Sequence, residues 1–159
     1  MENMIFSVCE RFMTKDDPSY LEGTDCKCEE IVSVDCGLFD HEQQREYDDK
    51  RVLAENEQWL AVLMMKKGEE TPVLEGFEFC GYDLAEGDED CFVLGTSSLT
   101  NCPNYFNEVF SFKDLNRYGL LDSREEAERL QELLPERYPD EQHAFCAIYA
   151  VWRKIKAGK

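Results

Sequence analysis

Two nearly continuous apolar segments constrain the fold most. They cover residues 58–67 and 144–155. Both have the length of a strand that is buried in a sheet, and the second is rich in β-branched and aromatic residues. Periodicity alone leaves a buried helix open for the first segment. We expect both segments to be strands of one sheet.

Shorter segments around them predict further elements. Alternating or β-branched patterns predict strands at 4–13, 31–36, 77–82 and 91–94. A helix is predicted to begin after Ser123, because Ser123 and Glu126 have the spacing of a capping box. Its apolar stripe ends at Pro135, which is expected to stop it. A second, shorter helix is predicted at 112–117.

The order of these elements indicates the fold class. Strands come first, two helices follow and a strand closes the chain, without regular alternation of strands and helices. This order predicts an α+β fold with a largely antiparallel sheet and helices packed on one face. The 159 residues are expected to form a single domain, 1–159. The highly charged segment 40–56 is compatible with an exposed helix or a mobile insertion.

The charge of the chain is far from balanced. It has 17 Lys and Arg against 35 Asp and Glu, which gives a net charge of −18. Such a field repels nucleic acids and anionic membranes and attracts basic proteins. The sequence therefore favours a basic protein partner. The alternatives are an acidic surface that only keeps the protein soluble, and mimicry of nucleic acid.

The start of the chain bears on its location. The sequence MENMIFSVCERFM has no basic segment, and a charged pair soon interrupts its apolar residues. This is not the pattern of a signal peptide, and no apolar run reaches the ~18–20 residues that span a bilayer. We expect a cytoplasmic protein whose eight cysteines are reduced.

The cysteines allow two further hypotheses. A structural zinc site would use Cys9, Cys26, Cys28 and Cys36. The C-x-C spacing is one residue shorter than that of the usual zinc ligand pairs, so buried thiols are favoured and no cofactor is predicted. A cysteine-dependent enzyme would use Cys102 or Cys146 with His143. The negative field disfavours a thiolate, so the chain is expected not to be an enzyme.

An acidic turn is the best candidate for a binding face. It lies around Gly87 and lacks the ligand spacing of a calcium loop. Acidic residues of the 40–56 segment extend the candidate face. The predicted partner-binding residues are Asp48, Asp49, Glu86, Asp88, Glu89 and Asp90.

The order of several short patterns resembles a known group of proteins. These patterns are GYDLAE at 81–86, SSLTNC at 97–102, the segment 115–130 and AIYAVWR at 147–153. Together they resemble small uncharacterised bacterial proteins that are similar to toxin-immunity proteins. The resemblance covers the C-terminal half and implies an inhibitor or adaptor that masks a basic partner. Because it carries no diagnostic signature, it transfers no binding residue.

Overall fold

The described part of the chain contains a four-stranded sheet. The computed structural model describes residues 4–9, 42, 58–85, 115–118, 120–141 and 144–155. The strands are β1 (Met4–Cys9), β2 (Gln58–Met65), β3 (Phe77–Ala85) and β4 (Ala147–Lys154). They lie in the order β1-β2-β4-β3, and each neighbouring pair is antiparallel. With helix α2 (Arg124–Arg137) packed against β3 and β4, the fold class is α+β, as predicted.

The two apolar segments form the inner strands, β2 and β4. Both are buried on both faces, which explains why their sequences are continuously apolar and do not alternate. Trp59 and Trp152 are each only 1% exposed. The strands are shorter than the predicted segments, since Lys66 and Lys67 lie exposed beyond β2 and β4 begins only at Ala147. Conversely, β3 continues to Ala85, three residues beyond its predicted end.

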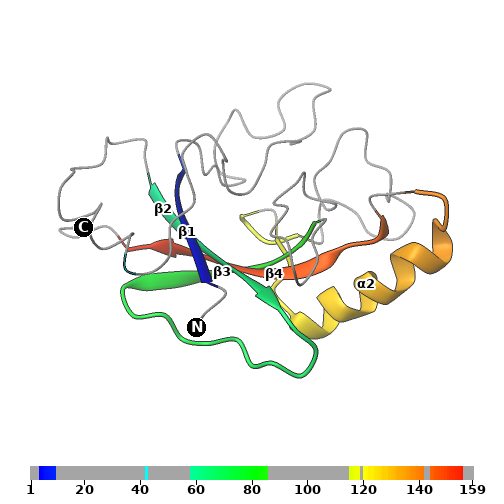
Figure 1. The fold of residues 1–159 in the computed structure, drawn as a ribbon, viewed down its shortest axis with the longest axis horizontal. Helices are drawn as coiled ribbons and strands as arrows, with labels where there is room; N and C mark the ends of the chain where they lie inside the picture. Colours follow the sequence, from blue (N-terminus) through cyan, green and yellow to red (C-terminus); the bar gives the residue numbers. More distant parts are fainter. Residues whose placement is uncertain are drawn as a thin grey trace.

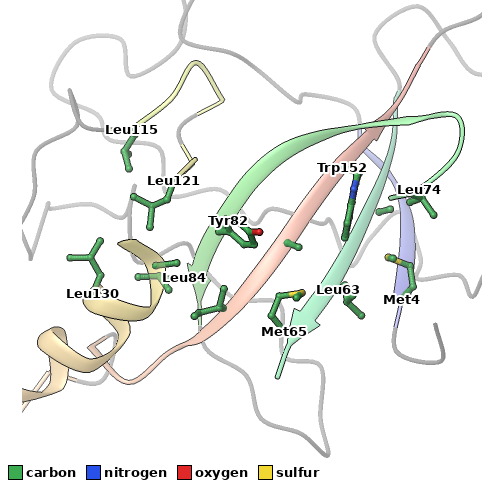
Figure 2. Close-up of a cluster of buried hydrophobic side chains, with 14 of the residues drawn as sticks. Met4, Leu63, Met65, Leu74, Tyr82, Leu84, Leu115, Leu121, Leu130 and Trp152 are labelled. Carbon is green, nitrogen blue, oxygen red and sulfur yellow. The ribbon is translucent and has the colours of Figure 1, made fainter. Parts of the chain in front are cut away.

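Helix α2 and the connection between β2 and β3 lie on the same side of the sheet (Figure 1). The helix buries Ala127, Leu130 and Leu134 against it. The connection, residues 66–76, contributes Leu74 to the same apolar cluster (Figure 2). A hydrogen bond of 2.6 Å between the Thr71 and Tyr82 hydroxyls also joins the connection to β3. The largest apolar cluster of the described residues therefore lies between the sheet and these two segments, and smaller clusters lie on the other face.

The start of α2 was predicted correctly and its end was not. The Glu126 amide donates to the Ser123 side chain at 3.2 Å, as the capping box requires. Pro135, however, lies inside the helix, which continues to Arg137. Pro135 has no amide to donate to the turn before it, but the helix continues past it, and the Tyr138 amide bonds the Leu134 carbonyl at 2.8 Å. No helix in the described part of the chain is long and apolar enough to cross a bilayer.

The second predicted helix, 112–117, is wrong where it can be compared. Residues 115–118 form a turn, and 112–114 lie outside the described residues. The Asn116 amide donates to the Leu120 carbonyl at 2.7 Å, so the backbone bond runs against the direction found in a helix. The Asn116 side chain accepts bonds from the Tyr118 and Leu120 amides and thereby stabilises the turn.

Candidate functional site

A cleft opens where the end of β2, the start of β4 and the first half of α2 meet. Its volume is about 320 Å³. Met65 at the end of β2 and Ile148 near the start of β4 give it an apolar wall, since the two residues pair in the β2–β4 register and belong to one apolar cluster. Met64 also lines the cleft, but its side chain belongs to the cluster on the opposite face of the sheet. Such a volume lies at the lower end of the range of about 300–1,000 Å³ found for small-molecule sites.

Three cationic residues line this cleft. Lys66 and Lys67 follow directly after β2 and are exposed, and Arg124 is the first residue of α2. The Arg124 guanidinium is held in place: its Nη2 donates to the Lys66 carbonyl at 2.7 Å, and its Nε lies 3.5 Å from Glu128 Oε1. Neither lysine ammonium forms a hydrogen bond or ion pair with another described residue.

The opposite wall carries carboxylate, amide and thiol groups. Glu132 and Gln131 come from the second and third turns of α2, and Gln131 Nε2 donates to the Cys146 carbonyl at 3.1 Å. This bond ties the helix to the residue before β4. Burial, followed by the negative charge of Asp83, raises the pKa of the Cys146 thiol to about 12. The thiol is therefore neutral at physiological pH, and at this site it behaves as an apolar group.

A second polar cluster lies on the other face of the sheet, at the start of β3. Glu78 Oε1 accepts hydrogen bonds from the Tyr118 hydroxyl at 2.6 Å and from Arg153 Nε at 2.5 Å. The guanidinium groups of Arg153 and Arg117 lie 4.9 Å and 5.2 Å from the centre of the Tyr118 ring. Glu78 and Arg153 face each other in the β3–β4 register, so the sheet itself brings the pair together.

The contacts within this cluster determine the protonation states of its side chains. The hydrogen bond from Tyr118, followed by Arg153, holds the pKa of the Glu78 carboxyl below its usual value. Burial and the bond to Glu78 raise the pKa of Tyr118 to about 12. At neutral pH the cluster thus consists of a carboxylate, a neutral phenol and guanidinium groups. This arrangement joins the 115–122 segment to β3 and β4, and it offers no group that could act as a base near neutral pH.

Tyr118 reaches Glu78 because the 115–122 segment lies directly against β3. Asn116 Nδ2 donates to the Cys80 carbonyl and to Asp122 Oδ1, each at 2.8 Å. Tyr82 and Leu121 exchange backbone hydrogen bonds of 2.8 Å and 2.9 Å. Between these contacts lies Gly81, at the irregularity in the β3–β4 register, with a φ of +137°. A Cβ at Gly81 would lie 2.8 Å from the Leu121 carbonyl oxygen, so only glycine fits.

The site residues predicted from sequence lie almost entirely outside the described residues. This holds for all the predicted partner-binding residues, which are Asp48, Asp49, Glu86, Asp88, Glu89 and Asp90. It also holds for Cys26, Cys28, Cys36, Cys102 and His143. The backbone of Cys9 is in β1, but its side chain is not described. Of the predicted site residues, Cys146 is the one whose side chain is described, and its raised pKa disfavours a nucleophilic role.

Neither the metal-ligating side chains nor the comparison with known proteins assigns a function to the chain. Within the described residues, no three His, Cys, Asp or Glu side chains are grouped so that they could hold a metal ion. Cys80 and Cys146 are free thiols. No protein-family model matches the chain, and no curated protein or solved structure matches it either.

The cleft was not predicted from the sequence, although two features of the sequence indicate it. Lys66 and Lys67 are adjacent cations at the end of an apolar strand in an acidic chain. Arg124 is a cation at the first position of a helix, where the helix dipole disfavours positive charge. Each signal is weak alone, and the two come together because α2 packs on β3 and β4 and its Arg124 reaches the Lys66 carbonyl beyond β2.

Proposed function

We propose that the chain is an acidic binding protein, an immunity-like inhibitor or adaptor that masks a basic protein partner in the cytoplasm. The observation that carries this proposal is the net charge of −18 on 159 residues. A charge of this size attracts a basic surface over several ångströms and raises the association rate.

The exposed side of α2 carries a second acidic surface, which provides a comparison of equal charge for the specific face. Glu125, Glu132 and Glu136 are exposed, and they recur at helical spacing on the side opposite the buried residues. Arg129, which lies in the same stripe, is bound to Glu126 by hydrogen bonds of 3.0 Å and 2.5 Å. Its charge is therefore compensated locally, and the stripe stays negative. In this proposal the helices as a group cover one face of the sheet, as α2 does.

The specific face in this proposal is the acidic turn around Gly87. Its residues are Glu86, Asp88, Glu89 and Asp90, extended by Asp48 and Asp49. These residues lie outside the described part of the chain; in the sequence, Glu86 follows directly after Ala85, the last residue of β3. A rigid strand that leads into an acidic turn is a suitable support for a binding surface.

The experiment compares two triple variants with the same change in charge. The first is Asp88→Lys, Glu89→Lys and Asp90→Lys; the second is Glu125→Lys, Glu132→Lys and Glu136→Lys on α2. The measurement is the association rate with the partner that the wild-type chain captures, at several salt concentrations. We expect the first variant to lose most of the association rate and the second to keep most of it. Equal losses would mean that bulk charge and no defined face is responsible, which would refute the named surface.

A further inference from the structure

We propose that the cleft beside α2 binds a small organic acid, with one anionic group at Lys66 and Lys67 and an apolar body against Met65 and Ile148. The site uses other residues than the acidic turn named in the proposed function, and its lining has a net positive charge. The proposal rests on three features of the cleft: its charge, its walls and its size.

The residues that line the cleft have a net positive charge, which one bound anion would balance. Its lining contains three cations, Lys66, Lys67 and Arg124, against the two carboxylates of Glu128 and Glu132. Arg124 and Glu128 compensate each other across 3.5 Å. Two lysines then face one carboxylate, which leaves one positive charge in excess. In a chain with about twice as many acidic as basic residues, this local excess attracts an anion to the cleft.

The lysines are available for a ligand. They are exposed, and neither ammonium forms a hydrogen bond or ion pair with any other described residue. The position of the Lys66 backbone, in contrast, is fixed, because its carbonyl accepts the bond from Arg124. The chain therefore holds the start of the turn firmly and leaves two flexible ammonium groups beside the cleft. An ammonium group is a compact charge that binds a carboxylate from several directions.

The walls select an apolar body. Met65 and Ile148 are each at most 7% exposed, yet they line the cleft. The neutral thiol of Cys146 adds a further apolar surface. Methionine side chains adapt to ligands of different shape, because they are unbranched and polarizable. Water in such a cleft is released when an apolar group enters, and this release favours binding.

The size limits the ligand to a small molecule. A volume of about 320 Å³ accommodates a short aliphatic or aromatic acid. Inorganic phosphate would satisfy the lysines but leave the apolar walls uncovered. We therefore expect the affinity to depend on both the charge and the apolar body of the ligand.

The test uses hexanoate as the probe and the methionine methyl groups as reporters. The chain has five methionines. Met65 lines the cleft with its side chain on the α2 face, while Met4 lies in β1 outside the cleft and serves as an internal control. Titration of the methyl-labelled protein with hexanoate should shift the Met65 signal saturably and leave Met4 unchanged. Hexylamine, which has the same apolar body and the opposite charge, should produce no saturable shift.

Matched variants test the role of the lysines. The double variant Lys66→Gln and Lys67→Gln should weaken hexanoate binding by about tenfold or more, because it removes both charge-assisted contacts. Arg129→Gln and Arg137→Gln change the net charge equally on α2 away from the cleft, and this variant should bind like the wild type. All four residues are exposed, so the variants are expected to fold. The proposal is wrong if hexanoate causes no saturable shift, if hexylamine or phosphate binds equally well, or if both double variants bind alike.

Discussion

Replacement of Gly81 by alanine should destabilise the protein far more than replacement of the other described glycines. Gly81 lies in β3 where the 115–122 segment contacts the strand, and its φ of +137° is a conformation that other residues rarely adopt. The new Cβ would also lie within 2.9 Å of Asn116 Nδ2 and of Leu120 Cβ. The substitution therefore forces either the strand backbone or the adjacent segment to move.

The expected size of the effect follows from these two contributions. The strained backbone costs about 1–3 kcal/mol, and crowding of a packed site costs about 1–3 kcal/mol more. The sum is centred near ~4 kcal/mol, a large fraction of the ~5–15 kcal/mol that stabilises a typical domain. Gly68 and Gly76 are matched controls, because their φ values are +80° and +83° and a Cβ there would meet nothing within 4 Å. Alanine at either control position should cost only about 1–2 kcal/mol.

Urea unfolding followed by tryptophan fluorescence measures the difference. The two tryptophans of the chain, Trp59 and Trp152, are both buried in the sheet and report its unfolding. With a typical slope of about 2 kcal/mol per M, Gly81→Ala should lower the urea midpoint by about 2 M. Gly68→Ala and Gly76→Ala should lower it by less than about 1 M. If all three variants unfold at similar urea concentrations, the described contact between β3 and the 115–122 segment is wrong.

Four further predictions concern single groups. Ser123→Ala removes the cap of α2 and should lower the free energy of unfolding by about 1 kcal/mol, whereas Ser123→Asp should retain most of it; a loss with both would contradict the cap. Glu78→Gln should lower the pKa of Tyr118 from about 12 towards 10.0, seen in an ultraviolet titration against Tyr118→Phe, and an unchanged pKa would contradict the bond. The pKa of Glu78 in the folded protein lies below its usual 4.5, so the ionised carboxylate stabilises the fold at neutral pH. This contribution is lost as the pH falls through the folded pKa. Glu78→Gln should therefore make the free energy of unfolding less dependent on pH in the acid range. The pKa values of Cys80 and Cys146 are raised from 9.0 to about 12, so at a pH of about 8 each thiol forms roughly a thousandfold less thiolate than an ordinary cysteine. Iodoacetamide should therefore label both residues slowly until urea unfolds the protein. Rapid labelling of the folded protein would contradict their burial.

Local sequence patterns predicted the elements that depend on local chemistry. The cap of α2 was found because Ser123 and Glu126 act within one turn of the chain. The strand at 77–82 was found because Phe77, Glu78 and Phe79 alternate, and the alternation indeed places Glu78 on the face opposite the core. The continuous apolar segments were recognised as buried strands, and their burial on both faces accounts for the lack of alternation.

Features that depend on distant contacts were not predictable in the same way. The turn at 115–118 was predicted to be helical, because nothing in the local sequence shows that the Asn116 side chain bonds the Cys80 carbonyl 36 residues earlier. The pairing of Glu78 with Arg153 depends on the β3–β4 register across 75 residues. The cleft depends on how α2 packs beside Met65 and Ile148, and a packing arrangement leaves no spacing pattern in the sequence.

Affinity capture at two salt concentrations tests the central claim most directly. The immobilised chain is exposed to a lysate of its source organism at about 50 mM salt and eluted at about 500 mM, where the Debye length falls from ~14 Å to ~4 Å. The captured proteins are identified by mass spectrometry. The account predicts one dominant basic protein that binds at low salt, is released at high salt and is lost with the Asp88→Lys, Glu89→Lys and Asp90→Lys variant. Capture of no basic protein, or of one whose retention does not depend on salt or on these residues, would contradict it.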